Sequence, residues 1–468
     1  MKGKRFLLVG LFAFLTGCTL IPKYTKPEAP VPATWPSGPA YKETQAAPGA
    51  PLAADLKWRE FFTDERLQKI IETALNSNRD LRLAALTVER ARALYRIQRA
   101  ELLPTVNAVG SGGKERVPAA LSSTGKSYTA EQYSINLGIY SWEIDFFGRI
   151  RSLKERALEE YFATEEARRS AQILLVSEVA NAYLTLAGDR EALQLADSTL
   201  ETQQAAYDLI RRRYEKGVAT ALDLRQAQTQ VDAARVDIAR YTNRAAQDEN
   251  ALNLLVGSTV PGALLPEALS NVAPPKGIAP GMSSEVLLQR PDILQAEHLL
   301  KAANANIGAA RAALFPRISL TTAIGTASAE LSGLFKAGSD NWNYSAQIVL
   351  PIFDARTWSA LTVTKVDREI ALAQYEKAIQ GAFREVADAL AQRGTVGDQL
   401  AAQESLVNAY AETYRLSNLR YEKGVDSYLG VLDAQRSLRV SEQVLIALRL
   451  ARITNQVRLY AVLGGGTE

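Results

Sequence analysis

The feature that most constrains this chain is a short motif that occurs twice, about half the chain length apart. The sequence Arg-Tyr-Glu-Lys-Gly-Val fills residues 213–218 and returns at residues 420–425. In each copy a long Ala-rich helical pattern leads into the motif, a glycine interrupts it, and a second helical pattern follows. A repeat at this distance indicates an internally duplicated chain, because solenoid repeats have periods of only about 20 to 50 residues. The sequence therefore predicts two long helical hairpins, with tight tips near residues 217 and 424.

Composition excludes several classes of function. The chain carries 54 Lys and Arg against 51 Asp and Glu, so it has no large basic field and no nucleic-acid partner is expected. It has one cysteine and one histidine, which excludes a disulfide framework and an ordinary Cys/His zinc site. His298 lies in helical sequence without a nucleophile or acid motif, and the Gly-rich runs at 110–113 and 464–466 lack the strand-to-helix context of a phosphate loop. We therefore expect no catalytic residue, no metal and no cofactor, and the protein is not expected to be an enzyme.

The N-terminus has the pattern of an export and lipidation signal. Basic residues at positions 2, 4 and 5 precede an apolar stretch over residues 6–15, which suits a signal peptide and is too short to span a bilayer. The sequence Leu-Thr-Gly-Cys that ends at Cys18 resembles a bacterial lipobox. In such proteins the signal peptide, here residues 1–17, is removed and the cysteine receives acyl chains such as palmitate. Thr19, by resemblance to lipoprotein sorting, favours the outer membrane, where acyl chains anchor a protein without spanning. An ordinary cleavage site with a stray thiol is the alternative.

The remaining chain divides into two halves with the same predicted order of elements: a helix, a β-hairpin, and long helices that contain a tip. The first half is residues 64–255 with its β-hairpin at 104–142, and the second is residues 282–462 with its β-hairpin at 316–351. The connecting segments are a Pro-rich tether and equatorial segment at 18–63, a linker at 256–281 and a C-terminal tail at 463–468. Nearly unbroken helical sequence occupies residues 149–187, 189–255, 356–393 and 395–462.

The predicted strands alternate apolar residues with small or polar ones, as strands that face lipid on one side and a lumen on the other do. Aromatic residues near the strand ends predict two belts. One level holds Tyr133, Trp342 and Tyr344, and the other holds Tyr140, Trp142, Phe146, Phe315 and Phe353. A soluble sheet packed on helices would show the same alternation. The upstream export signal and the small polar face favour strands in a membrane. No stretch of 18 residues in the mature chain is continuously apolar, so no transmembrane helix is expected.

Four strands are too few to close a barrel by themselves. Lipid does not tolerate open sheet edges, because water is not available to satisfy the backbone N–H and C=O groups. Known single-chain barrels begin at eight strands. If these strands span a membrane, at least two copies of the chain must therefore pool them.

Three motifs together resemble one protein family. They are the repeated tip motif, the sequence Leu-Leu-Gln-Arg-Pro-Asp-Ile at 287–293, and Trp-Glu-Ile-Asp-Phe-Phe-Gly-Arg at 142–149. They look like the outer-membrane factors of the TolC superfamily, closest to the OprM-like, NodT-type lipoprotein branch, and the resemblance covers essentially the whole mature chain. It implies a mainly α fold with a small β part. Three copies would then share a twelve-stranded outer-membrane barrel above a long periplasmic barrel of α-helices.

The resemblance also implies a function and partners. Outer-membrane factors are passive exit channels for antibiotics and other small amphipathic compounds. They work with a periplasmic adaptor (membrane fusion) protein and an inner-membrane pump of the resistance-nodulation-division (RND) class. The protein would be a homotrimer, located in the cell outer membrane, contacting outer-membrane lipid through barrel and acyl anchor, and extending into the periplasm. A duct for type I protein secretion and a lipid-anchored coiled-coil scaffold without a pore remain alternatives.

The helix that leaves the second tip carries a candidate gate. Leu429, Asp433 and Arg436 lie at i, i+4 and i+7 and so share one face of that helix. In an assembly with threefold symmetry, a face turned towards the axis would form an apolar ring and an acidic ring, which constrict a pore by dewetting and by charge. By resemblance, Leu429 and Asp433 match the rings that close the periplasmic end. The alternative is that Leu429 packs in the coiled coil and Asp433 is solvated.

The resemblance assigns two further roles near the tips. The adaptor would dock on the tips themselves, at Gly217, Val218, Gly424 and Val425, although a helix turn that needs positive φ explains the glycines equally well. The family's closed state uses an arginine two residues after the tip glycine, and this chain has Asp426 there. Asp223 and Tyr421 remain as candidate closed-state contacts.

Overall fold

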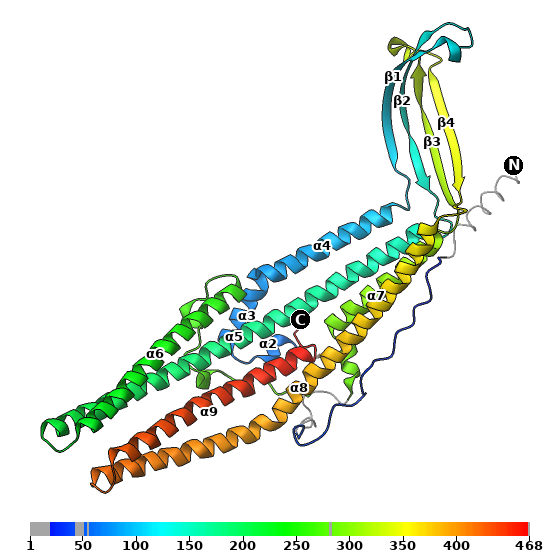
Figure 1. Cartoon of the computed structure of the whole chain (residues 1–468). Helices are drawn as coiled ribbons and strands as arrows, with labels where there is room; N and C mark the ends of the chain where they lie inside the picture. The colour runs from blue at the N-terminus through cyan, green and yellow to red at the C-terminus, as the bar shows by residue number, and fades with distance from the viewer. Residues whose placement is uncertain (1–18, 43–50, 54–55, 280–282, 467–468) are drawn as a thin grey trace. The chain divides into compact units, whose positions relative to one another are not determined.

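The computed structural model describes residues 19–42, 51–53, 56–279 and 283–466, so Cys18 and the predicted signal peptide lie outside the described residues. The chain divides into two compact units, and Figure 1 labels the helices and strands that they contain. The first, which we call the sheet unit, takes in residues up to 28, 87–164 and 295–375. The second, which we call the tip unit, takes in 29–86, 165–294 and the chain from 376 onward.

The order of elements confirms the internal duplication and the mainly α class. Among the described residues, the first α-helices are the short α2 (Trp58–Phe61) and α3 (Glu65–Ser77). The first repeat is α4 (Arg79–Ala100), β1 (Val106–Val117), β2 (Tyr128–Glu143), α5 (Arg149–Glu215) and α6 (Ala221–Val256). The second repeat has the same order: α7 (Pro291–Ala312), β3 (Arg317–Ser328), β4 (Asp340–Val349), α8 (Ala355–Glu422) and α9 (Tyr428–Val462).

The four strands form one antiparallel sheet in the order β1-β2-β3-β4. The register places Leu137 of β2 across from Ile324 of β3, and Ile324 across from Trp342 of β4. Ile135 and Ile139 lie on the same face across from Thr326 and Thr322, so this face of the sheet is largely apolar. The opposite face carries Ser111, Ser134 and Asn136, which are joined by side-chain hydrogen bonds, among other small residues. The predicted alternation of an apolar face and a small polar face is therefore present.

The strands differ from the sequence-based expectation in two respects. β1 and β2 are longer than the sequence predicts: its pattern favours a strand over residues 105–113 and a polar loop up to about residue 130, whereas Lys114 and Glu131 pair across the ladder and extend it. The aromatic levels are also different, because the register sets Trp342 level with Leu137 and Tyr344 level with Ile139. Both residues are thus nearer to Tyr140 than to Tyr133, and the predicted upper belt is wrong for them.

Two helices run through glycines at which the sequence indicated a break. α5 continues through Gly188 and α8 through Gly394, although glycine costs about 1 kcal/mol relative to alanine inside a helix. At Gly394 the reason is a close approach, because a Cβ atom there would lie 2.3 Å from the carbonyl oxygen of Ala40. The absence of a side chain lets the N-terminal segment lie directly on α8 within the tip unit.

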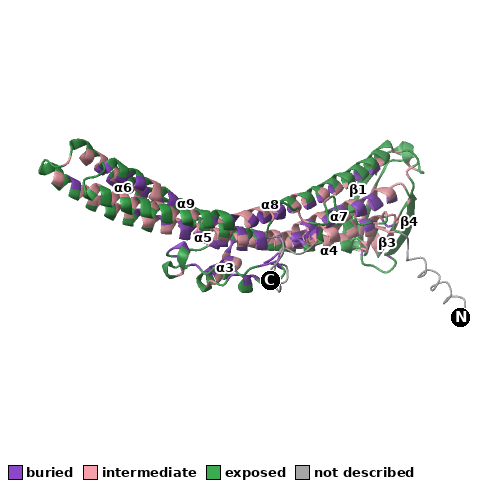
Figure 2. Cartoon of the chain, turned by 90° about the horizontal axis from the view of Figure 1, so that it is seen from below, coloured by how far each residue is buried: buried purple, intermediate pink, exposed green. Residues whose placement is uncertain are grey.

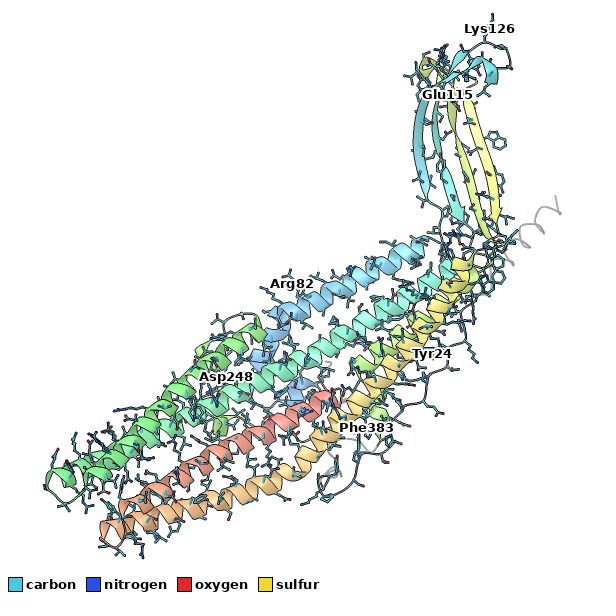
Figure 3. The ribbon with its side chains drawn as sticks, viewed as in Figure 1. Tyr24, Arg82, Glu115, Lys126, Asp248 and Phe383 are labelled. Atoms are coloured by element: carbon cyan, nitrogen blue, oxygen red, sulfur yellow. The ribbon has the colours of Figure 1, made fainter. Side chains whose placement is uncertain are left out.

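The same segment is held in the sheet unit by α7. Asn304 donates to the carbonyl oxygen of Pro22 at 2.8 Å, and Arg311 donates to that of Leu20 at 3.2 Å. A Cβ atom at Gly308 would lie 2.6 Å from Cγ1 and 2.9 Å from Cα of Ile21. Residues 20–24 therefore lie against α7, where Tyr24 is labelled in Figure 3.

Buried residues belong mainly to the helices, and the strands are mostly exposed or half-buried (Figure 2). Among the described residues one helix, α5, is long and apolar enough on average to cross a membrane, although no 18 of its residues are continuously apolar. Its most apolar 18 residues are 61% buried inside the protein. This burial is what the core helix of a bundle shows, and the composition of α5 is weak evidence for a membrane span.

Candidate channel gate and helical hairpin tips

The two tips have the same backbone turn. Gly217 and Gly424 both adopt φ of 74°, a left-handed conformation that glycine adopts without steric cost. In the first tip the N–H of Val218 donates to the carbonyl oxygen of Arg213 at 2.8 Å, and in the second Val425 donates to Arg420 at 2.9 Å. This closing bond satisfies a carbonyl group that the helix end would otherwise leave free. The turn leaves both valines exposed at the tips.

The residues after the glycines stabilise the two tips in different ways. Thr220 and Asp223 form a reciprocal capping box at the start of α6, with Asp223 accepting from the N–H of Thr220 at 2.9 Å. α9 begins after Ser427, whose side chain makes no capping hydrogen bond. Instead Asp426 pairs with Arg420, at 2.5 and 3.1 Å, and this hydrogen bond from Arg420 lowers the pKa of Asp426. Asp426, at the position where the resemblance leads us to expect an arginine, thus stabilises the turn of the second tip through Arg420.

An apolar cluster near the tips joins the two hairpins within the tip unit. Its buried members come from three helices: Ile210, Ala227, Tyr428, Val431 and Leu432. Tyr421 packs against this cluster, with its ring 5.1 Å from that of Tyr428 and the guanidinium of Arg213 5.1 Å from its centre. Burial raises the pKa of Tyr428 to about 12, and Tyr414, Tyr421 and Asp223 add to this effect.

The structure places the three gate candidates together on one exposed face of α9. Leu429 is 60% exposed, and Asp433 and Arg436 form an exposed ion pair at 2.5 Å. Val431 lies on the opposite side of the helix and is buried, and Leu432, about 60° round the axis from Leu429, is buried at the edge of this face. The Leu429 face is therefore directed away from the core of its own chain, where it is free to meet other copies or a lumen.

The two candidate closed-state residues both have partners within the chain. Asp223 serves the capping box of α6, and Tyr421 packs between Arg213 and Tyr428. No hydrogen bond joins these two side chains in the described part of the chain, but both lie next to Tyr428. A role in closing a pore stays a prediction for both.

Sequence reasoning missed one ionic contact between the hairpins. Asp237 of α6 is 5% exposed and pairs with Arg240 at 2.7 Å and with Arg439 of α9. The Asp237–Arg240 spacing of i and i+3 was visible in the sequence. Arg439 is about 200 residues away, and no pattern in a single sequence connects it to Asp237.

The remaining polar candidates have structural partners. The ring nitrogen Nδ1 of His298 lies 2.6 Å from a carboxylate oxygen of Glu159, and Phe162 packs beside the ring. Within the described ranges, no group of three or more His, Cys, Asp or Glu side chains could hold a metal ion.

Comparisons with known proteins agree with this arrangement. The family model described as "Outer membrane efflux protein" matches residues 70–258 and 282–465. The antibiotic efflux pump outer membrane protein ArpC and the toluene efflux pump outer membrane protein TtgC, both from Pseudomonas putida, are each 50% identical over 465 residues, which cover 99% of this chain and 96% of theirs. The open state of the MtrE outer membrane channel of Neisseria gonorrhoeae is 38% identical with a TM-score of 0.85, covering 96% of this chain and 99% of that one. The resemblance drawn from the motifs is confirmed, and the chain belongs to the outer membrane efflux protein family.

Proposed function

We propose that this protein is the outer-membrane exit duct of a tripartite efflux system. Three copies form the duct, which passively conducts antibiotics, solvents and other small amphipathic compounds. A periplasmic adaptor protein and an inner-membrane RND pump deliver these compounds and supply the energy. The names of ArpC and TtgC, which concern antibiotics and toluene, support these two classes of cargo.

The observation that carries the proposal is the four-stranded sheet with two unlike faces and two incomplete edges. β1 and β4 each pair on one side only among the described residues. One face is apolar, as a lipid-facing surface must be, and the other carries small residues with Ser, Thr and Asn, as a water-filled lumen requires. A sheet of this kind is stable in a membrane only when its edges are closed by other strands.

Within the sheet unit, the helices next to β1 and β4 carry exposed apolar residues beside these two sheet edges. α4, which leads into β1, has no buried residue and exposes Leu94 and Ile97. α8, which follows β4, exposes Val363, Val366 and Ile370 on one face. The β1 side of one copy and the β4 side of the next are different surfaces, and such head-to-tail contacts generate closed rings. The family resemblance supports three copies and a total of twelve strands.

The Leu429 face of α9 forms the gate in this proposal. Three Leu429 side chains make an apolar constriction, and three Asp433–Arg436 pairs make a charged one. Because the ion pair is exposed, it contributes less than about 1 kcal/mol to stability. The gate residues can therefore be replaced without loss of the fold.

Planar-bilayer recordings of the purified, acylated protein test the proposal. Asp433→Ala and Leu429→Ala should each raise the conductance and antibiotic entry into cells. Asp433→Ala should also shift the ion preference towards anions, because Arg436 loses its acidic partner. The first tip supplies matched controls, since Leu222 is 66% exposed and aligns with Leu429, and Gln226 aligns with Asp433.

Two results would contradict the proposal. A protein that is monomeric both in detergent and in native envelopes cannot close its sheet. A trimer that shows no conductance even with Asp433→Ala is not a channel. If the Leu222→Ala and Gln226→Ala controls raise the conductance as much as the α9 variants, the constriction lies elsewhere.

A further inference from the structure

A groove in the sheet unit lies between the N-terminal segment, α7 and α8. The walls are formed by Pro22 and Lys23 from the segment, Asn304 and Arg311 from α7, and Lys365 and Arg368 from α8. The hydrogen bonds from Asn304 and Arg311 to backbone carbonyls of the segment hold this wall in place. The groove is therefore built by three separate elements rather than by one exposed helix.

The groove is strongly positive. Its four basic side chains face one carboxylate, Glu369, which already pairs with Arg368 at 2.8 Å. Lys23 and Lys365 are exposed and form no ion pair within the described part of the chain. Two unpaired ammonium groups from two separate elements that line one groove are suited to an anionic group that contacts both.

One face of α8 leads from the groove back towards the exposed apolar residues between β4 and α8. Trp358, Thr362 and Lys365 lie at i, i+4 and i+7, and so Lys365 is about 10 Å along the helix from Trp358. Phe353, just before α8, is 91% exposed and Trp358 is 63% exposed. An aromatic residue at the membrane interface followed by a lysine towards the aqueous side is typical of a lipid contact.

The basic side of the groove remains accessible in the proposed ring. The α8 surface assigned to the neighbouring copy is formed by Val363, Val366 and Ile370, of which Val366 also lines one edge of the groove. Lys365 points about 130° round the helix axis from the centre of that surface. The groove is lined mainly by polar side chains, and neighbouring copies need not cover it.

We infer that this groove binds the phosphate group of an anionic glycerophospholipid in the inner leaflet of the outer membrane. The acyl chains would pack near Phe353 and Trp358, and the phosphate would lie between Lys23 and Lys365. A free phosphate ion would use the two lysines but would gain nothing from the aromatic residues. The inference requires that the sheet span the outer membrane, but it does not require that the protein conduct.

Native mass spectrometry of the full, acylated protein in phosphatidylglycerol or in phosphatidylcholine nanodiscs tests this inference. The wild type should retain phosphatidylglycerol in preference to phosphatidylcholine. The double variant Lys23→Ala with Lys365→Ala should bind it about 30-fold more weakly, from roughly 1 kcal/mol for each basic residue near a lipid surface. The control is Lys69→Ala with Lys377→Ala, which removes the same charge at exposed positions outside the groove.

The outcomes separate the possible ligands. Equal loss of lipid in both double variants, or equal retention of both lipids by the wild type, would overturn the inference. Displacement of the lipid by millimolar inorganic phosphate would also overturn it, because the site would then be one for the free ion. Trimer content and bilayer conductance of the groove variant should match the wild type, so a failure here leaves the proposed duct intact.

Discussion

Replacing Gly308 by alanine should release the N-terminal segment from the sheet unit. The new Cβ atom would lie 2.6 Å from Cγ1 and 2.9 Å from Cα of Ile21, and 2.7 Å from Oγ of Ser152. Carbon atoms in good contact are about 3.5–4.0 Å apart. The segment must therefore move by about 1 Å, since the contact involves its backbone and not only a flexible side chain.

The size of the effect follows from the bonds that this movement breaks. The bond from Arg311 to Leu20 is already 3.2 Å and would be lost, and the bond from Asn304 to Pro22 would be strained. A hydrogen bond from a charged donor contributes about 1.5–3 kcal/mol and a neutral one about 0.5–1.5 kcal/mol. Alanine returns about 0.5–1 kcal/mol as the better helix former. The net loss of docking energy is about 1–3 kcal/mol.

Hydrogen–deuterium exchange measures this change directly. A loss of about 1–3 kcal/mol should speed exchange of the amides in residues 20–26 by about 5- to 150-fold. Gly381→Ala is the matched control, because a Cβ atom at Gly381 of α8 would meet nothing within 4 Å. Unchanged exchange in Gly308→Ala, or equal acceleration in Gly381→Ala, would refute the steric argument.

Two further predictions concern the helices and the sheet. Burial and then Asp189 raise the pKa of Asp248, labelled on α6 in Figure 3, to about 6. Because this folded-state pKa lies above the ordinary 3.8, the carboxylate destabilises the fold above pH 6, and the penalty fades as the pH falls towards 4. After discounting for solvent screening, the Asp248→Asn variant should then be about 1 kcal/mol more stable than the wild type at pH 8, with a smaller gain at pH 4. Thermal melts followed by circular dichroism measure both gains. A gain that does not depend on pH would contradict this cause. Gly325→Ala should prevent strand pairing at a cost of about 3 kcal/mol or more, because its Cβ would lie 2.0 Å from the carbonyl oxygen of Ile135. The control is Gly113→Ala, which should assemble normally because a Cβ atom at Gly113 would have no atom within 4 Å. The yield of heat-stable oligomer on gels compares the two variants, and equal yields would show that the sheet accommodates both substitutions.

Local patterns in the sequence were sufficient to predict the duplication, the β-hairpins and the two tips. Period-two alternation identifies strands, and a glycine after a helical run identifies a left-handed turn, as Gly217 and Gly424 confirm. The i, i+4, i+7 spacing also placed Leu429, Asp433 and Arg436 on one face correctly. Each of these inferences depends only on residues within a few positions of one another.

The errors arose where distant segments meet. Gly394 resembles a helix break until Ala40 is found lying against it, and the levels of Trp342 and Tyr344 depend on strand register that alternation alone does not set. The pairing of Asp237 with Arg439 is equally invisible to a local pattern. In all three cases tertiary contacts decide the outcome, and a single sequence does not record them.

The unlike edges of the sheet have a consequence for inheritance. Each copy contributes a β1 edge and a β4 edge, so one copy with a damaged edge leaves a breach in any ring that includes it. In the proposed ring of three copies, intact and damaged copies that are produced equally and mix at random would give about one undamaged ring in eight. A mutant protein that has one damaged edge but still enters the ring would therefore be dominant negative, because most intact copies would be trapped in damaged rings.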